Sequence, residues 1–162
     1  MKYLLLTSIF LSFNIFSGET VFSDELDEFT DERLIYIGLV NDERNFDELI
    51  AIFCDDSSAR MGVRKGIIIS SNSTILVTFR FDKRKPIAHE FNYLSSEGIL
   101  MSRDIDFMKL FLKELKNSYN VIVKIEGEDG IMRYSELKYS KKNVADFMKA
   151  ASEMPPSKCN FS

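Results

Sequence analysis

The chain has 162 residues and a formal net charge of −4, with 21 basic residues against 25 acidic ones. Its hydrophobic content of 45% is enough for one domain with a packed core, and the length is too short for two comfortable domains. The acidic balance argues against a nucleic-acid-binding protein, because such proteins usually carry a surplus of Lys and Arg. We therefore expect a single domain that binds no nucleic acid.

Residues 1–18 have the pattern of a secretory signal peptide. Lys2 gives a short basic start, and a mainly apolar stretch precedes the small residues Ser17 and Gly18. A membrane anchor is the alternative, but an anchor needs about 20 consecutive apolar residues, and this stretch is shorter and is broken by polar side chains. The sequence predicts cleavage near residue 18 and a periplasmic or secreted chain without a stable membrane anchor.

Residues 19–32 form the most acidic stretch of the chain, with seven Asp and Glu side chains. Such a concentration of like charge is typical of a solvated segment that adds little to a core. We expect a flexible acidic leader, followed by one globular domain over residues 33–162. An acidic tail that binds a partner is the alternative interpretation.

From residue 33 the chain is a succession of short runs rich in Ile, Val, Phe and Tyr, separated by polar clusters. Runs of this composition and length are typical of β-strands. The first three runs, at 33–40, 48–54 and 61–70, are joined by short connections. They predict an antiparallel meander.

The next two runs, at 73–82 and 86–93, predict a β-hairpin, because both alternate between apolar and polar residues on either side of a charged turn. One face of this hairpin is predicted to carry Ile75, Val77, Phe79, Phe81, Ile87, His89, Phe91 and Tyr93. Pro86 is acceptable as the first residue of the second strand. The apolar face should pack on the core.

The charged turn of the hairpin is the candidate interaction site. Lys83, Arg84 and Lys85 lie at its tip, either as a docking element or as a solvated turn that discourages aggregation. Arg80 and Asp82 are two residues apart on one strand face, so they can pair with each other or across the hairpin. Alternatively, Arg80 recognises an external carboxylate or sugar acid.

His89 is the only histidine of the chain. Because it falls on the apolar face of the hairpin, we expect a core or core-edge residue that is hydrogen-bonded to a neighbour. A catalytic imidazole would need a nucleophile or carboxylate from elsewhere, and a zinc site would need three or four ligands. The sequence assigns no catalytic, cofactor-binding or metal-ligating residue, and no cofactor is expected.

Two amphipathic helices are predicted, one over residues 104–117 and one that follows Ser140 as its cap. Between them, residues 119–127 and 131–139 predict a second hairpin with a turn framed by glycines. The resulting fold class is α+β. It is an antiparallel β-sheet meander of about eight strands, sandwich-like, with one helix between strands and one at the C-terminus.

The chain contains two cysteines, Cys54 and Cys159. An even pair in an exported protein is most simply one disulfide, which would tie a strand to a C-terminal tail that has little apolar surface of its own. Two free thiols with a redox or metal role are the alternative, but there is no CxxC spacing.

Several of these segments together resemble a known family, the small exported VasI-like accessory proteins found with bacterial type VI secretion systems. The resemblance covers residues 29–159 and rests on the strings FTDERLIYIGLV, LIAIFC and VTFRFDKRKP, followed by a helix, a hairpin, a last helix and a late cysteine. Phe91 stands where the family often has a tryptophan. The family supplies no catalytic residues to carry over, and the resemblance implies an envelope location and a binding or accessory role.

Two classes of function follow. The first is a noncatalytic exported protein of the bacterial envelope or secretion apparatus that acts through protein–protein contacts, as an accessory factor or as a periplasmic inhibitor or immunity protein. The second is a small secreted cell-wall hydrolase that uses carboxylates such as Asp55, Asp56 or Glu90. A glycosidase needs one carboxylate kept protonated in an apolar pocket, whereas the aspartates lie in a polar turn. We expect no enzyme; the partner would be an envelope or secretion-system protein, and the oligomeric state is open.

Overall fold

The structure, a computed structural model, describes residues 19–26, 33–42, 45–55, 58–65, 73–94, 98–126 and 130–153, together with Cys159 and Phe161. These residues form nine strands and two helices. The strands are β1 (Glu19–Leu26), β2 (Arg33–Asp42), β3 (Asn45–Asp55), β4 (Ala59–Lys65), β5 (Thr74–Phe81), β6 (Ile87–Leu94), β7 (Ile99–Ser102), β8 (Asn120–Glu126) and β9 (Met132–Lys138). The helices are α1 (Ile105–Lys116) and α2 (Lys141–Glu153). The predicted signal peptide lies outside the described residues.

All the described strands belong to one sheet, in the order β1-β2-β3-β4-β7-β6-β5-β8-β9, and every pairing is antiparallel. The first four strands follow chain order as a meander. β7 joins this meander to the rest through a short pairing in which Met61 lies opposite Ser102 and Val63 opposite Leu100. We call this junction of β4 with β7 the seam.

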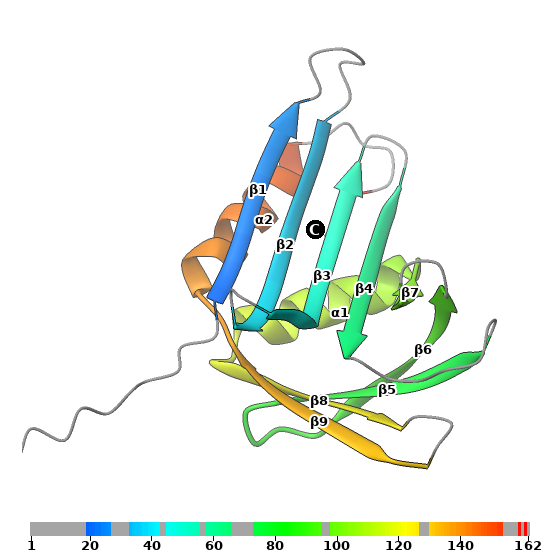
Figure 1. The fold of residues 1–162 in the computed structure, drawn as a ribbon. Coiled ribbons are helices and arrows are strands. Elements are labelled where there is room, and N and C mark those ends of the chain that lie inside the picture. Colours follow the sequence, from blue (N-terminus) through cyan, green and yellow to red (C-terminus); the bar gives the residue numbers. More distant parts are fainter. Residues whose placement is uncertain are drawn as a thin grey trace, which may run out of the picture.

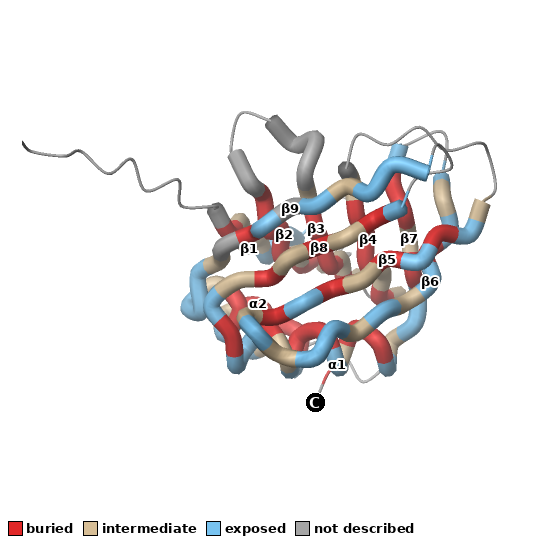
Figure 2. The backbone as a smooth tube through the Cα atoms, turned by 90° about the horizontal axis from the view of Figure 1, so that it is seen from below, coloured by how far each residue is buried: buried red, intermediate tan, exposed pale blue. Residues whose placement is uncertain are grey.

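The sheet folds around its two helices. In Figure 1, β1 to β4 run side by side, and β5, β6, β8 and β9 cross below them at a steep angle. Both helices lie behind the meander in that view, and Figure 2 shows them on one side of the strands. The face of the sheet that looks toward the helices is called the inner face below, and the opposite face is the outer face.

The core lies between the inner face and the helices. Along β5, Ile75, Val77, Phe79 and Phe81 are buried, and the residues between them are exposed or half-buried. The ring of Phe79 lies at the centre, with ring centroids 5.2 Å from Phe111 and 5.8 Å from Phe107. Because α1 supplies both of these phenylalanines, the helix and the hairpin form one aromatic cluster that is largely closed to water.

The first helix begins where the sequence predicts, and its cap is Asp104. The Oδ1 atom of Asp104 accepts a hydrogen bond of 2.9 Å from the backbone N–H of Phe107. An aspartate at this position satisfies a helical N–H that has no partner within the helix and places negative charge at the positive end of the helix dipole. The cap therefore fixes the direction in which α1 leaves the seam.

The acidic leader is corrected in part by the structure, because residues 19–26 form the edge strand β1. β1 pairs with β2 along its whole length, from Glu19 opposite Val40 to Leu26 opposite Arg33. The hydroxyl of Thr20 accepts a 2.6 Å hydrogen bond from the backbone N–H of Ser140, just before α2. This strand is therefore held by backbone pairing with β2 and, at Thr20, by a contact with the residue that precedes α2. The rest of the predicted leader lies outside the described residues.

The α+β class, the large antiparallel sheet and the two helices, one between strands and one C-terminal, are confirmed. The hairpin of β5 and β6 has the predicted faces, with Val77 opposite His89 and Ile75 opposite Phe91. In place of two sheets packed face to face, one sheet wraps around the helices. The part of the predicted third strand beyond Lys65 lies outside the described residues.

Candidate functional site

Asp82 follows β5 at the start of the hairpin turn, where its φ of 49° is in the left-handed region. Its Oδ1 atom accepts hydrogen bonds from the backbone N–H groups of Tyr119 (3.0 Å) and Asn120 (3.2 Å). Aspartate suits this position because its short side chain tolerates a positive φ and bonds nearby backbone groups. Asp82 therefore fastens the turn to the start of β8, and this is a structural role.

Arg84 is also committed to the fold, although the sequence predicts it to be an exposed residue of the tip. Its guanidinium forms an ion pair with the carboxylate of Glu114 near the end of α1 and donates a 3.1 Å hydrogen bond to the Glu114 carbonyl oxygen. A cation at a helix C-terminus is favourable because it faces the unpaired carbonyl groups. Arg84 is half-buried, whereas Lys83 and Lys85 are exposed.

Arg80 lies on the outer face of β5, exposed to solvent. It lies opposite Ile122 of β8, which in turn lies opposite Glu136 of β9. The Asp82 carboxylate accepts hydrogen bonds from the backbone at the start of β8. These bonds, and not the predicted pairing with Arg80, fix the position of the Asp82 side chain. The five candidate interaction residues thus separate into two that bind the fold and three, Arg80, Lys83 and Lys85, that are exposed.

His89 is a core-edge residue, as the sequence predicts. Its ring stacks on Phe107 with centroids 4.2 Å apart and an angle of 9° between the planes, and it meets the edge of Phe91. The Nε2 atom lies 2.9 Å from the hydroxyl oxygen of Ser102. The side chain is 21% exposed, so the imidazole is mostly enclosed by the aromatic cluster.

The contact between His89 and Ser102 has the composition of a base and a nucleophile, but the geometry does not suit catalysis. Ser102 is only 5% exposed, and its hydroxyl oxygen also accepts a hydrogen bond from the backbone N–H of Asp104. The carboxylate of Asp104 lies 3.9 Å from the same Nε2 atom that contacts the serine. In a catalytic triad the acid contacts the other ring nitrogen. The three residues instead join β6, β7 and the cap of α1.

Of the carboxylates proposed for the hydrolase alternative, the two that the structure describes, Asp55 and Glu90, do not form a catalytic pair. Asp55 accepts a 2.6 Å hydrogen bond from the backbone N–H of Ser58 and closes the turn between β3 and β4. Glu90 is exposed on the outer face of β6, and Asp56 lies outside the described residues. Among the residues that the structure describes, the buried polar or charged ones are Thr20, Ser102 and Ser118, and none of them is a carboxylate.

Cys54 and Cys159 form the predicted disulfide, with their Cα atoms 5.9 Å apart. Both cysteines are buried, Cys54 at the end of β3 and Cys159 in the C-terminal tail. The tail packs on the core more than expected, because Phe161 is also buried. Its ring lies 5.9 Å from that of Phe147 on α2. The bridge and this aromatic contact together hold the end of the chain on the core.

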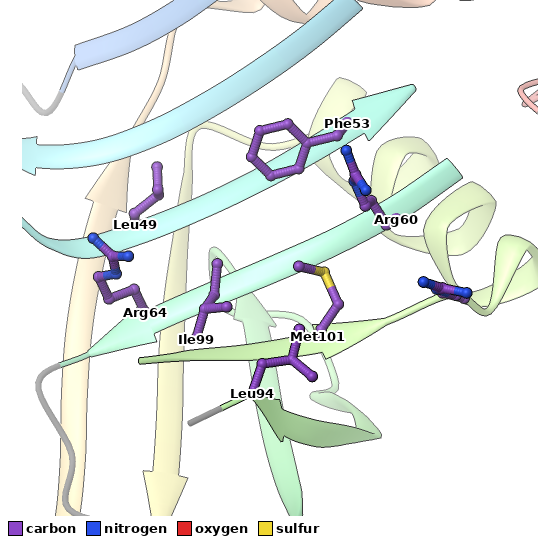
Figure 3. A pocket seen from close by; sticks show the side chains of 8 residues that line it. Leu49, Phe53, Arg60, Arg64, Leu94, Ile99 and Met101 are labelled. Carbon is purple, nitrogen blue, oxygen red and sulfur yellow. The ribbon is translucent and has the colours of Figure 1, made fainter. Parts of the chain in front are cut away.

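A hollow lies on the outer face, across the seam (Figure 3). Its volume is about 470 Å³, within the range of about 300–1,000 Å³ that is usual for ligand pockets. It is lined by Leu49, Phe53, Arg60, Arg64, Leu94, Ile99, Met101 and Arg103. We call these eight residues the arginine hollow. They come from four strands and the residue after β7, so the hollow exists only in the folded sheet.

Gly62 gives the hollow its depth. A Cβ atom at this position would come within 2.5 Å of the Cδ1 atom of Ile99 and within 3.8 Å of the Phe53 ring. The glycine therefore lets Ile99 of the neighbouring strand lie across β4, where it is 5% exposed and forms part of the apolar floor. A side chain here would push Ile99 outward and fill the space above the seam.

The electrostatic character of the hollow comes from its three arginines, because no carboxylate is among the described residues that line it. The guanidinium of Arg60 lies over the ring of Phe53, 5.8 Å from its centroid, and 3.8 Å from the carboxylate of Asp55. The second distance is well beyond the about 2.7–2.9 Å of a charge-assisted hydrogen bond. Arg60 is thus stacked but only loosely paired.

The register of the seam brings the positive charges together. Met61 lies opposite Ser102, with Arg60 preceding Met61 on β4 and Arg103 following Ser102 directly after β7, so the two arginines flank the same residue pair. Like charges on neighbouring strands repel one another. Figure 3 shows Arg60 and Arg64 on β4 near opposite ends of the apolar floor. An anion with an apolar body would relieve the repulsion between the arginines and would cover the floor.

Sequence reasoning misses the hollow, although one signal of it is present. In the segment ARMGVRK, the residues that alternate with the inward-facing Met61 and Val63 are Arg60, Gly62 and Arg64. Two arginines on either side of an outward-facing glycine indicate a positively charged face with room above it. The apolar floor cannot be inferred in this way, because it is assembled from strands that are far apart in the sequence.

Comparisons with known proteins do not add to these observations. No protein-family model matches the chain, and neither the curated proteins nor the solved structures give a match. Within the described ranges, no group of three or more potential metal-ligating side chains was found. Among the same described residues, no helix is long and apolar enough to cross a membrane.

Proposed function

We propose that this chain is a noncatalytic exported protein that binds another protein of the bacterial envelope or secretion apparatus through the arginine hollow. The observation that carries the proposal is the hollow itself: three arginines around an apolar floor on a chain whose overall charge is negative. Arginine, methionine and aromatic side chains are enriched at protein interfaces, and arginine is among the residues that dominate the binding energy there.

Binding is favoured over catalysis by the chemistry of the described side chains. The described residues of the hollow present guanidinium and hydrocarbon groups, which bind and orient a partner, and none of these described side chains carries a hydroxyl, thiol, imidazole or carboxylate. The one serine–histidine contact is enclosed between α1 and the hairpin. A binding role is what remains best supported, and no observation favours the cell-wall hydrolase.

The proposed location is the periplasm or the exterior of the cell. The disulfide between Cys54 and Cys159 supports it, because such bonds persist in oxidising compartments and are rare in the cytosol. The apolar N-terminal stretch of the sequence is consistent with export. An accessory factor and an inhibitor or immunity protein would use the same surface, and they differ in whether the partner is a secretion component or a toxin.

The proposal is tested by capture with purified full-length protein from an envelope extract of the native cells. Wild-type protein, Arg103→Gln and Arg80→Gln should be compared, with captured proteins identified by mass spectrometry. Arg103 and Arg80 are both exposed arginines, but only Arg103 lines the hollow. We expect one partner that the wild type and Arg80→Gln retain and that Arg103→Gln loses.

Two results would contradict the proposal. One is a partner whose capture depends on Arg80, or on Lys83 and Lys85, while Arg103→Gln binds normally, because the hairpin would then be the docking element. The other is turnover of peptidoglycan by the wild type, because catalysis would then be the function. Thermal unfolding of each variant is the control for folding.

A further inference from the structure

We infer that the arginine hollow takes an extended acidic segment of the partner in which an apolar side chain lies between two carboxylates, in the order acidic, any, apolar, any, acidic. This inference rests on the proposed function and adds the chemistry of the partner. It follows from the spacing of the charges, the depth of the floor and the loose pairing of Arg60.

The spacing of the arginines selects the spacing of the acids. Arg60 and Arg64 are four residues apart on β4, with Gly62 midway between them on the same face. At about 3.3 Å per residue this separates their Cα atoms by roughly 13 Å. One carboxylate cannot span that distance, whereas two carboxylates four residues apart on an extended chain have the same separation.

The floor selects what lies between the acids. In an extended segment the residue midway between the two carboxylates points to the same side as they do. It would therefore enter the hollow over Gly62, where Phe53, Ile99 and Met101 form an apolar surface. An apolar side chain at that point removes its own surface and part of the floor from water.

The arginines are suited to carboxylates in particular. Arg60 is stacked over Phe53, which orients its planar guanidinium and leaves its edge N–H groups for a bidentate contact. The Asp55 carboxylate at 3.8 Å contributes a loose pair that an incoming carboxylate can displace. Arg103 is the next residue on the paired strand and adds a second positive charge at the same end. The carboxylate at this end of the hollow therefore meets two guanidinium groups, those of Arg60 and Arg103.

The occupant we infer is a protein segment, because the charges are spread over about 13 Å of the sheet face. A fatty acid carries one carboxylate and would leave the far end of the hollow unmatched. A second copy of this chain would bring acidic residues from its own N-terminal region, and self-association of the protein would reveal it.

The inference is tested with synthetic peptides titrated into the full-length disulfide-bonded protein by fluorescence anisotropy. The probe contains Glu-Ser-Leu-Ser-Glu between neutral ends. Two controls change one property each: Lys-Ser-Leu-Ser-Lys reverses the charge, and Glu-Ser-Ser-Ser-Glu removes the apolar group. A third control, Glu-Leu-Glu, halves the spacing of the acids and turns the leucine to the opposite side of the extended chain. We expect the probe to bind about tenfold more tightly than any control, since each control removes an interaction of the order of 1 kcal/mol.

Protein variants locate the binding. Arg103→Gln should weaken the probe by about five- to tenfold through the loss of one charged contact. Gly62→Ala should weaken it through displacement of Ile99 into the hollow, without any change of charge. Arg80→Gln is the matched control and should bind as the wild type does, because β6 and β7 lie between its strand and β4. Circular dichroism of each variant shows whether the fold is retained.

The remaining outcomes overturn the inference in distinguishable ways. If Arg103→Gln abolishes partner capture but no peptide distinguishes itself from its controls, the chemistry of the segment is wrong and the proposed function stands. Binding of laurate that depends on Arg103 would identify a lipid-like occupant instead. Self-association in sedimentation velocity that Arg103→Gln abolishes would identify a second copy. Probe binding that Arg80→Gln removes would place the site on β5.

Discussion

β3 and β5 both lie inside the sheet with partners on either side, but they use their outer faces differently. On β5 the inner face is buried, and the outer face carries the solvent-exposed residues Leu76 and Arg80. On β3 the outer face also excludes water, because Ala51 is 2% exposed and Phe53 is half-buried. Strict alternation of buried and exposed residues is therefore typical of a strand that only supports the core. Apolar residues on both faces indicate a strand that has a second task.

The second task of β3 is to build the apolar part of the hollow. The ring of Phe53 lies 6.0 Å from that of Tyr36 on β2 and beneath the guanidinium of Arg60 on β4. This aromatic row is not needed to close the core, which β3 serves with Ile50 and Ile52 on its other face. The difference between the two strands is thus a difference between stability alone and stability together with the recognition that we propose for the hollow.

The largest effect that separates the two faces is expected from Phe79→Ala. Phe79 is fully buried between three other phenylalanine rings, so its truncation leaves a cavity and should cost about 3–5 kcal/mol of the free energy of unfolding. Leu76→Ala on the same strand is the control, because Leu76 is 57% exposed, and it should cost less than about 0.5 kcal/mol. Urea denaturation measures both, and similar losses would contradict the assignment of the faces.

The next effect concerns the bridge at the end of β3. Cys54 and Cys159 are 105 residues apart, and closing a loop of that length is worth about 4.7 kcal/mol in the chain-entropy model, with about 2–4 kcal/mol being typical in practice. We expect Cys54→Ala with Cys159→Ala to lose an amount in the typical range. Denaturation of the wild type with and without reductant gives the same comparison without mutation.

A control for the bridge is Phe161→Ala in the oxidised protein. This change removes the aromatic contact with Phe147 and leaves the disulfide in place. The loss should be smaller than that of the double cysteine variant. An equal or larger loss would mean that the tail is held by apolar packing and that the bridge is secondary. Intact mass after alkylation shows whether the thiols are paired.

Much of the architecture is predictable because local pattern and tertiary environment agree. The hairpin of β5 and β6 alternates over its whole length, and its predicted faces are those of the structure. The helix after Asp104 and the disulfide follow from similar local or compositional signals. Where one face is buried and the other is wet, the sequence carries enough information.

Three features are not predictable, each for a physical reason. The charge of residues 19–26 hides β1, because the strand is set by its pairing with β2 along its whole length, which the local composition does not show. The ion pair of Arg84 depends on where α1 ends, and that is a tertiary fact. The arginine hollow combines strands that meet only at the seam, where three residue pairs join them. No local periodicity of the sequence predicts that these strands pair.

A moderate effect is expected from His89→Gln. Glutamine can keep a hydrogen bond to Ser102 but cannot stack on Phe107, so the loss should be about 0.5–1.5 kcal/mol. Because His89 lies on the inner side, capture of the partner should be unchanged once the variant is folded. Loss of capture at an unchanged melting temperature would show that the histidine belongs to the binding surface.

A smaller effect separates the residues of the hairpin tip. Arg84→Gln removes the ion pair with Glu114, whose two side chains are 38% and 24% exposed, so solvent screening limits the loss to about 0.5–1 kcal/mol. Lys83→Gln and Lys85→Gln should change the free energy of unfolding by less than about 0.5 kcal/mol. Chemical denaturation of the three single variants measures the contrast. Equal effects would mean that the triplet acts as one solvated turn.

The smallest effect lies at the edge of the sheet, where the hydrogen bonds from Arg33 hold the pKa of Asp24 below its usual range. Because the pKa is lower in the folded chain than in the unfolded chain, the contribution of Asp24 to stability is fully present above the ordinary carboxyl value of 3.8. It is lost as the pH falls through the lower, folded value. The carboxylate is partly exposed, so the contribution should stay below about 1 kcal/mol.

The measurement is the free energy of unfolding of the wild type and of Asp24→Asn at neutral pH and at several pH values below 3.8. We expect the wild type to be the more stable at neutral pH and the difference to shrink as the solution becomes more acidic. High salt should also reduce the difference, because it screens exposed charges. Equal stability of the two proteins at every pH and salt concentration would show that the carboxylate of Asp24 does not contribute to holding the edge of the sheet.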